Sequence, residues 1–195
     1  MLVALASDAH SELNVARRVN GDPTRPVHIT EEGRGEARGL GLQLANLPLD
    51  LCLRTRFGRT LETAKLALAG RNVPVEIEPL FDDVDVGDLE GQTIEEYHAW
   101  KHVHVRADPF PGGESLDDAA RRYAEAFRNV VARGLASVLV VCHEIPIRYA
   151  LNATGGSDDL DGPVHAIPNA SPFLFGERAL RVAADRIELL AGQGS

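Results

Sequence analysis

The most constraining feature of the sequence is a set of short, uninterrupted apolar runs that alternate with helical patterns. The clearest run is VLVVC at 138–142, a similar run occupies 2–6, and a further strand candidate at 49–53 is apolar except for Asp50. Strands that are apolar at every position are typical of parallel sheets covered by helices on both faces. The alternation therefore predicts an α/β protein with a mostly parallel central sheet.

Spacing and capping residues give the expected elements. Thr30 and Ser115 are suitable N-caps, and each precedes acidic residues that favour the first turn of a helix. Helices are expected over 31–47, 58–69, 94–102, 115–133 and 145–153. Strands are expected over 2–6, 49–53, 73–77, 138–142, 171–175 and 180–190. The last two strands are predicted to form a closing antiparallel pair.

Length and charge limit the possible partners. The 195 residues suffice for one domain, and the net charge of −9 opposes binding to a nucleic-acid backbone. A local pocket can still accept a small phosphorylated or anionic ligand. No apolar run is long enough to span a membrane or serve as a signal peptide. Cys52 and Cys142 lie in apolar runs, so we expect buried free thiols and a cytoplasmic location.

Chemically reactive side chains follow three of the apolar runs. Ser7, Asp8 and His10 follow the first run, a basic segment spans 54–59, and His143 follows the run at 138–142. Ligands of open α/β sheets bind beyond the carboxyl ends of the strands. We therefore expect these three segments to meet at one site.

Six further segments resemble the histidine phosphatase superfamily, which is also called phosphoglycerate mutase-like. In chain order they are ITEEGRGEARGLGLQL, TRFGRTLETAKLAL, FDDVDVGDLEGQTIEE, PGGESLDD, VLVVCHEIPIRYAL and IPNASPFLF. Each motif alone is short, but all six follow the family's order. The resemblance implies a three-layer α/β/α sandwich formed by one domain, 1–195, with a small cap insertion around 92–114.

The resemblance also assigns the end of the first strand, where the family has Leu-Val-Arg-His-Gly-Glu. The family's arginine binds phosphate and its histidine is the nucleophile. Without gaps, LASDAHSELN places Ser7 at the arginine, Asp8 at the histidine, Ala9 at the glycine and His10 at the acid. The Arg-His pair that defines the family is therefore expected to be absent.

Other site residues match the family pattern. Ser11 and Asn14 match its Ser/Thr and Asn, and Arg59 matches the second phosphate-binding arginine. His143 matches the second histidine, and Asp83 matches the general acid, with Asp in place of the commoner Glu. The resemblance thus implies that Asp8, Asp83 and His143 are catalytic positions. It implies ligand contacts at the remaining positions: Ser7, His10, Ser11, Asn14 and Arg59.

The changes at Ser7 and Asp8 remove one cation and add one anion where a phosphate would bind. Two like charges about 4 Å apart repel by about 4 kcal/mol at an effective dielectric near 20. The first hypothesis is therefore a ligand-binding or regulatory member with little or no phosphohistidine chemistry. In that case Asp8 pairs with Arg59 or His143 and fills the phosphate site from within.

Two catalytic alternatives remain open. A phosphomonoester hydrolase can use either Asp8, which commonly needs a cation such as Mg²⁺, or a metal-activated water as its nucleophile. Alternatively, Asp8, His10, Asp83 and His143 can converge on Zn²⁺, Mn²⁺ or Fe²⁺ in a hydrolase of a non-phosphate substrate. That set requires the first strand to continue through His10; if the chain turns earlier, His10 points elsewhere. The first hypothesis needs no cofactor, whereas the alternatives need a divalent metal.

The expected cap contains three histidines near Trp100. His98 and His102 are four residues apart and share a helical face, and His104 follows closely. One interpretation is metal binding, and the other is a surface helix whose side chains face solvent or the pocket mouth. In the second interpretation Trp100 and His102 are candidate ligand contacts.

Overall fold

A computed structural model describes residues 1–192. The strands are β1 (Leu2–Ser7), β2 (Leu51–Arg54), β3 (Val75–Ile77), β4 (Ser137–Cys142) and β5 (Phe173–Gly176). The helices are α1 (Glu12–Ala16), α2 (Glu31–Gln43), α3 (Gly58–Ala67), α4 (Ile94–Val103), α5 (Leu116–Ala132), α6 (Glu144–Thr154) and α7 (Glu177–Ala191). The segment between β3 and α4 contains two 3₁₀ turns, Pro79–Phe81 and Gly87–Leu89.

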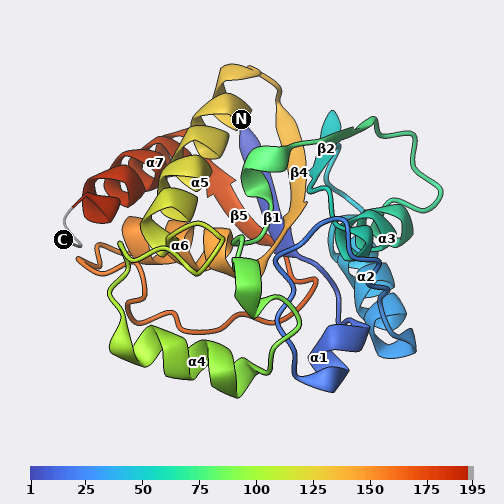
Figure 1. Ribbon diagram of the computed structural model, residues 1–195. Helices are drawn as coiled ribbons and strands as arrows, with labels where there is room; N and C mark the ends of the chain where they lie inside the picture. The colour runs from blue at the N-terminus through green and yellow to red at the C-terminus, as the bar shows by residue number, and fades with distance from the viewer. Residues whose placement is uncertain (193–195) are drawn as a thin grey trace.

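The five strands form one sheet in the order β3-β2-β4-β1-β5 (Figure 1). All neighbours are parallel except β5, which runs antiparallel to β1. In the pairing of β1 with β4, Ser7 lies opposite Cys142. The two strands therefore end at the same level, and the Asp8 amide donates to the Cys142 carbonyl over 2.9 Å. This register brings Asp8 and His143 to the same edge of the sheet.

Helices cover both faces of the sheet, as the apolar strands predicted. Helices α5, α6 and α7 lie on one face, and α2 and α3 lie on the other (Figure 1). Along β4, Val138 and Val140 belong to the core with α5, whereas Leu139 and Val141 pack with α2 and α3. Every residue of β4 is buried, which explains why the strand carries no charge. The predicted α/β/α sandwich is confirmed.

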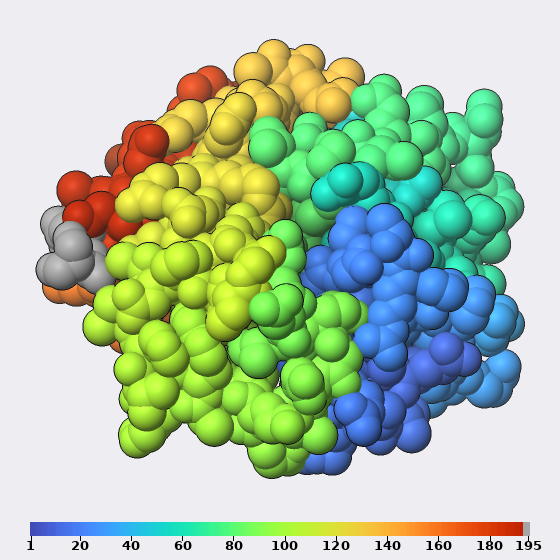
Figure 2. Space-filling model, in the orientation of Figure 1, coloured from blue at the N-terminus to red at the C-terminus, as the bar shows by residue number. Residues whose placement is uncertain are grey.

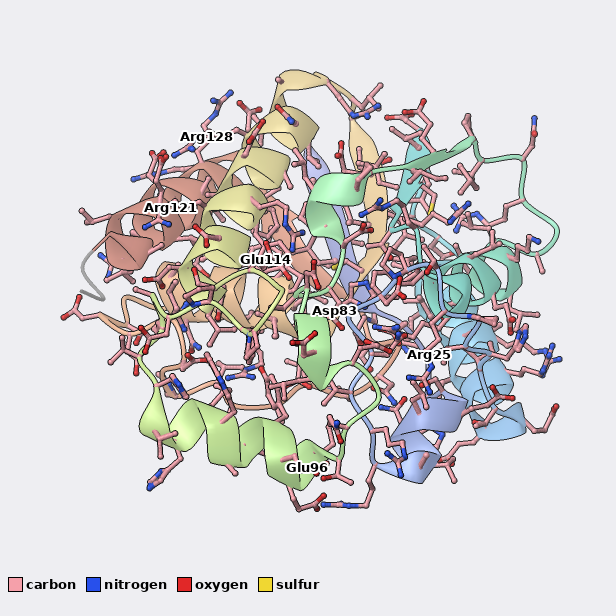
Figure 3. All side chains as sticks on the ribbon, viewed as in Figure 1. Arg25, Asp83, Glu96, Glu114, Arg121 and Arg128 are labelled. Atoms are coloured by element: carbon pink, nitrogen blue, oxygen red, sulfur yellow. The ribbon has the colours of Figure 1, made fainter. Side chains whose placement is uncertain are left out.

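The predicted strand over 180–190 is wrong, because this segment belongs to α7. Leu180, Ala183, Ile187 and Leu190 recur at helical spacing and are buried in the core that α5 also lines. Arg121 and Arg128 of α5 extend toward α7 in Figure 3, where Arg121 donates to the Ala191 carbonyl and Arg128 pairs with acids of the helix. The predicted antiparallel strand is present as β5, but its partner is β1.

The α4 segment lies outside the two helical layers and contacts the chain around α1. Arg18 forms a bridge with Thr93, and Arg17 forms an ion pair with Glu95. Figure 2 shows the corresponding green and blue residues in contact on one face of the molecule. This contact covers the carboxyl ends of the strands from one side. Within residues 1–192, no helix has both the length and the apolar character needed to cross a membrane.

Candidate ligand-binding site

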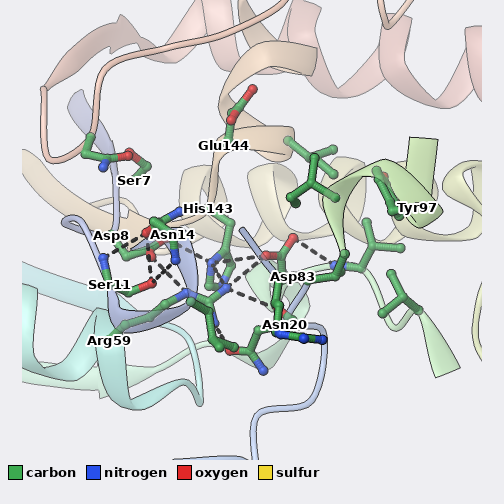
Figure 4. Close-up of a pocket in the computed structure, with 18 residues that line it drawn as sticks. Ser7, Asp8, Ser11, Asn14, Asn20, Arg59, Asp83, Tyr97, His143 and Glu144 are labelled. Carbon is green, nitrogen blue, oxygen red and sulfur yellow. Dashed lines mark hydrogen bonds and ion pairs between the residues drawn. The ribbon is translucent and has the colours of Figure 1, made fainter. Parts of the chain in front are cut away.

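A pocket of about 230 Å³ lies at the carboxyl ends of β1 and β4. Asp8 follows β1, His143 follows β4, Arg59 comes from the first turn of α3, and Asp83 comes from the segment after β3. Figure 4 shows these side chains, together with Asn20, gathered at one end of the pocket. The three segments that were expected to meet do so here.

Arg59 is the centre of this cluster. Its Nε donates to Asp8 Oδ2 over 2.8 Å, and its Nη2 donates to Asp83 Oδ2 over 2.9 Å. Its Nη1 donates to the side-chain oxygen of Asn20. The guanidinium also lies 4.4 Å from the centre of the Phe57 ring, a cation–π contact. Every nitrogen of Arg59 is therefore engaged by groups of the protein itself.

Asp8 has contacts on both carboxylate oxygens. Oδ2 accepts from Arg59, and Oδ1 lies 3.2 Å from Nδ1 of His143. Burial raises the pKa of Asp8, but the charge of Arg59 and the His143 contact together outweigh burial and hold this pKa below its ordinary value of 3.8. Asp8 is thus an anion at neutral pH and is paired inside the pocket.

His143 is held from both ring nitrogens. Nδ1 lies 3.0 Å from Nη2 of Arg59, and Nε2 lies 3.0 Å from the Thr55 hydroxyl. Thr55 in turn lies 2.9 Å from the Thr60 hydroxyl, and the Phe57 ring packs edge-on against the imidazole. The two threonines were not singled out from the sequence, although both lie in the TRFGRT segment. This shell fixes the ring at the floor of the pocket.

Asn20 is a second residue that sequence reasoning missed. Its side-chain and backbone oxygens both accept from Arg59. The following Gly21 packs so closely on the Val84 carbonyl that a Cβ at this position would collide with it. An Asn-Gly pair is a common turn signal, so the sequence alone gave no reason to place Asn20 at the site.

Ser7, Ser11 and Asn14 line the pocket on the side of β1 and α1. The Ser7 hydroxyl has one weak contact, 3.5 Å from the Pro168 carbonyl. Ser11 is the N-cap of α1 and forms a capping box with Asn14, whose Oδ1 accepts from the Ser11 amide over 2.8 Å. Ser11 and Asn14 therefore stabilise the start of α1, and their polar groups also adjoin the pocket.

His10 lies outside the pocket, because β1 ends at Ser7 and the chain turns before it. Its Nδ1 is 3.0 Å from the Thr30 hydroxyl and 3.8 Å from Glu32 at the start of α2. Gly33 packs on the His10 carbonyl so closely that a Cβ there would collide. The structure therefore does not bring His10 to Asp8, as the metal hypothesis required.

The remaining acidic and imidazole groups do not fit a metal ion either. The Arg59 guanidinium bonds to both Asp8 and Asp83, so a cation already occupies the space between the carboxylates. In the part of the chain that the structure describes, no three or more His, Cys, Asp or Glu side chains are arranged to hold a metal.

The three histidines around α4 do not line the pocket. His98 and His102 are exposed on α4, and His104 stacks on Trp100 with ring centres 4.0 Å apart. Trp100 also packs against Phe110 beneath the helix. The pocket is lined by neither Trp100 nor His102; the aromatic residue of α4 that lines it is Tyr97.

Cys142 belongs to the core and not to the site. It is fully buried beside β1, and burial raises the pKa of its thiol well above the ordinary value. The adjacent residue His143 turns to the pocket instead, as expected for neighbouring positions at a strand end. Cys52 is also buried, and burial raises its pKa to about 12.

Comparisons with known proteins agree with the architecture. The family model of the Histidine phosphatase superfamily (branch 1) matches residues 8–176. The adenosylcobalamin/alpha-ribazole phosphatase of Salmonella typhimurium is 30% identical over 153 residues, 74% of each chain. The 2,3-bisphosphoglycerate-dependent phosphoglycerate mutase of Methylobacterium radiotolerans is 28% identical over 192 residues, 89% of this chain and 88% of the mutase.

A solved structure has the same fold. YhfR of Bacillus stearothermophilus superposes with a TM-score of 0.79 at 25% identity and covers 90% of each chain. The sandwich and its pocket beyond the strand ends thus define a phosphoglycerate mutase-like α/β protein. The chain belongs to the histidine phosphatase superfamily.

Proposed function

We propose that this protein binds a ligand or serves a regulatory role on a histidine phosphatase fold, without phosphohistidine chemistry. In this proposal Asp8 stands where the family has its nucleophilic histidine, and Ser7 stands where it has its first arginine. The observation that carries the proposal is the 2.8 Å contact between Asp8 and Arg59. The carboxylate thus lies on the guanidinium that a phosphate would need.

Charge supports the same conclusion. Asp8 and Asp83 bring two negative charges to the single guanidinium of Arg59. A phosphate dianion would have to displace Asp8 and then remain close to both carboxylates. A single repulsion of this kind costs about 4 kcal/mol at about 4 Å and an effective dielectric near 20. That cost corresponds to a loss of several hundredfold in affinity.

We further propose that the partner is a small molecule and that the protein works in the cytoplasm. The pocket is small, about 230 Å³, and is lined by side chains from several elements. The net charge of −9 opposes binding to nucleic acid. Two buried free thiols suit a reducing compartment.

Hydrolysis of p-nitrophenyl phosphate tests the proposal. The wild type is expected to be inert with and without Mg²⁺, Mn²⁺ and Zn²⁺. The double variant Ser7→Arg/Asp8→His restores the cation and the imidazole, so it is expected to gain turnover. Ser7→Arg alone serves as the matched control, because it restores the cation without a nucleophile.

The same assay separates the catalytic alternatives. Turnover by the wild type that Asp8→Ala abolishes would refute the proposal and identify Asp8 as the nucleophile of a phosphomonoester hydrolase. Metal-dependent turnover that survives Asp8→Ala would instead favour a metal-activated water. The named relatives are a phosphatase and a mutase. Either outcome would make this protein a phosphatase as well.

A further inference from the structure

The surface that the pocket presents to a ligand is acidic. Among the central groups, the side chain of Asp83 is 24% exposed and that of Asp8 is 14% exposed, whereas Arg59 is only 6% exposed. The guanidinium is covered by Phe57 and by the two carboxylates that it binds. An entering molecule therefore meets carboxylate oxygens first.

The other charged residues of the lining do not reverse this balance. Glu144 lies at the rim and pairs with Arg148 on the next turn of α6. Arg18 is exposed and donates to the Gly91 carbonyl over 2.6 Å, so its charge faces solvent. The lining carries three acids, of which Glu144 is paired with Arg148, and two guanidinium groups, of which the inner one is covered by Asp8 and Asp83.

The opposite side of the pocket is apolar. Tyr97 lies across the pocket from Ser7 and Asp8 (Figure 4). The lining also includes several apolar side chains: Leu13, Val19, Val84, Val86, Ile94 and Ile145. The pocket thus offers both carboxylates and apolar side chains within reach of one small molecule.

We infer that the pocket recognises a small organic cation, a primary ammonium group attached to an apolar or aromatic body. The ammonium would lie against Asp83, the more exposed of the two carboxylates that cover Arg59. The apolar body would lie against Tyr97 and Ile94 and leave water. This inference rests on the proposed function, because it requires Asp8 to stay paired with Arg59.

Three probes of similar size test the inference by isothermal titration calorimetry at neutral pH. Benzylamine carries a positive charge, benzyl alcohol is neutral, and phenyl phosphate is an anion. We expect benzylamine to bind at least about tenfold more tightly than benzyl alcohol, and phenyl phosphate to bind more weakly than both. In Asp83→Asn, which keeps an oxygen acceptor for Arg59, the preference for benzylamine should disappear.

Asp88→Asn is the matched control, since Asp88 is an exposed acid of the same loop and does not line the pocket. It should keep the full preference. The inference is overturned if benzylamine fails to bind at millimolar concentration, if phenyl phosphate binds as tightly, or if Asp83→Asn keeps the preference. Phosphate release from phenyl phosphate would instead overturn the proposed function, so the two failures are distinguishable.

Discussion

Among single residues, Asp8 and Arg59 form the contact on which the site depends. Asp8→Ala leaves the buried guanidinium with Asp83 and Asn20 but removes one of its two carboxylates. We expect the free energy of unfolding to fall by about 3 kcal/mol, because breaking a buried pair leaves charge uncompensated. Urea denaturation measures the change. Asp88→Ala removes an exposed acid and should stay within about 0.5 kcal/mol; equal losses would contradict the argument.

Asp8 also predicts a pH dependence of stability. Its folded pKa lies below the ordinary value of 3.8, so the unfolded chain binds the proton more readily. The contribution of Asp8 is therefore complete above about pH 5 and is lost as the pH falls through the folded pKa. The difference in unfolding free energy between wild type and Asp8→Asn should be constant from neutral pH to about 5 and shrink below it. A difference in unfolding free energy that grows as the pH falls would contradict this prediction.

The sequence predicted part of this cluster and could not predict the rest. Asp8, Arg59 and His143 follow apolar strands or lie in a recognisable motif, so their convergence was expected. Asn20 and Thr55 contact the cluster through a turn and a loop whose course depends on tertiary packing. No local sequence pattern predicts the path of this turn and this loop. The direction of the His10 side chain is equally hard to predict, because it depends on the residue at which β1 ends.

Among the elements, α4 forms one wall of the pocket, and its start depends on a capping box. The Thr93 hydroxyl accepts from the Glu96 amide, and Glu96 accepts in return from the Thr93 amide. Thr93→Ala removes the cap, which should raise the hydrogen-exchange rate of the first amides of α4 by about fivefold. The amides of α5 provide the control within the same sample. Unchanged exchange in α4 would show that its packing alone holds the helix.

The helix α7 shows why an element can be misassigned from its sequence. Leu180, Val182 and Ala184 alternate with other residues, which favours a strand. In the structure Val182 is exposed, and the buried residues Leu180, Ala183 and Ile187 have a helical spacing that matches the face of α5. Small apolar residues fit both periods, so tertiary packing decides between them. The rest of the sandwich was predictable because the central strands β1 and β4 carry no charge and the motifs keep the family order.

For the whole molecule, the two-sided burial of the sheet predicts where stability is concentrated. Leu139 and Val140 are neighbours on β4 that face opposite helical layers, and both are fully buried. Each change to alanine should lower the free energy of unfolding by about 2 kcal/mol or more. Ile77→Ala on the edge strand β3, where the side chain is 50% exposed, should cost less than about 1 kcal/mol. Urea denaturation of the three variants measures this contrast, and a loss confined to one face would contradict it.

The contact between Asp8 and Arg59 has a consequence for competition by ions in solution. Asp8 is part of the chain, so it behaves as a tethered ligand of the guanidinium, and its effective concentration is in the millimolar range or above. A free anion must exceed that concentration to displace a carboxylate that never diffuses away. The arginine is thus insulated from free anions below that concentration, and only a more concentrated anion can change the charge of the pocket.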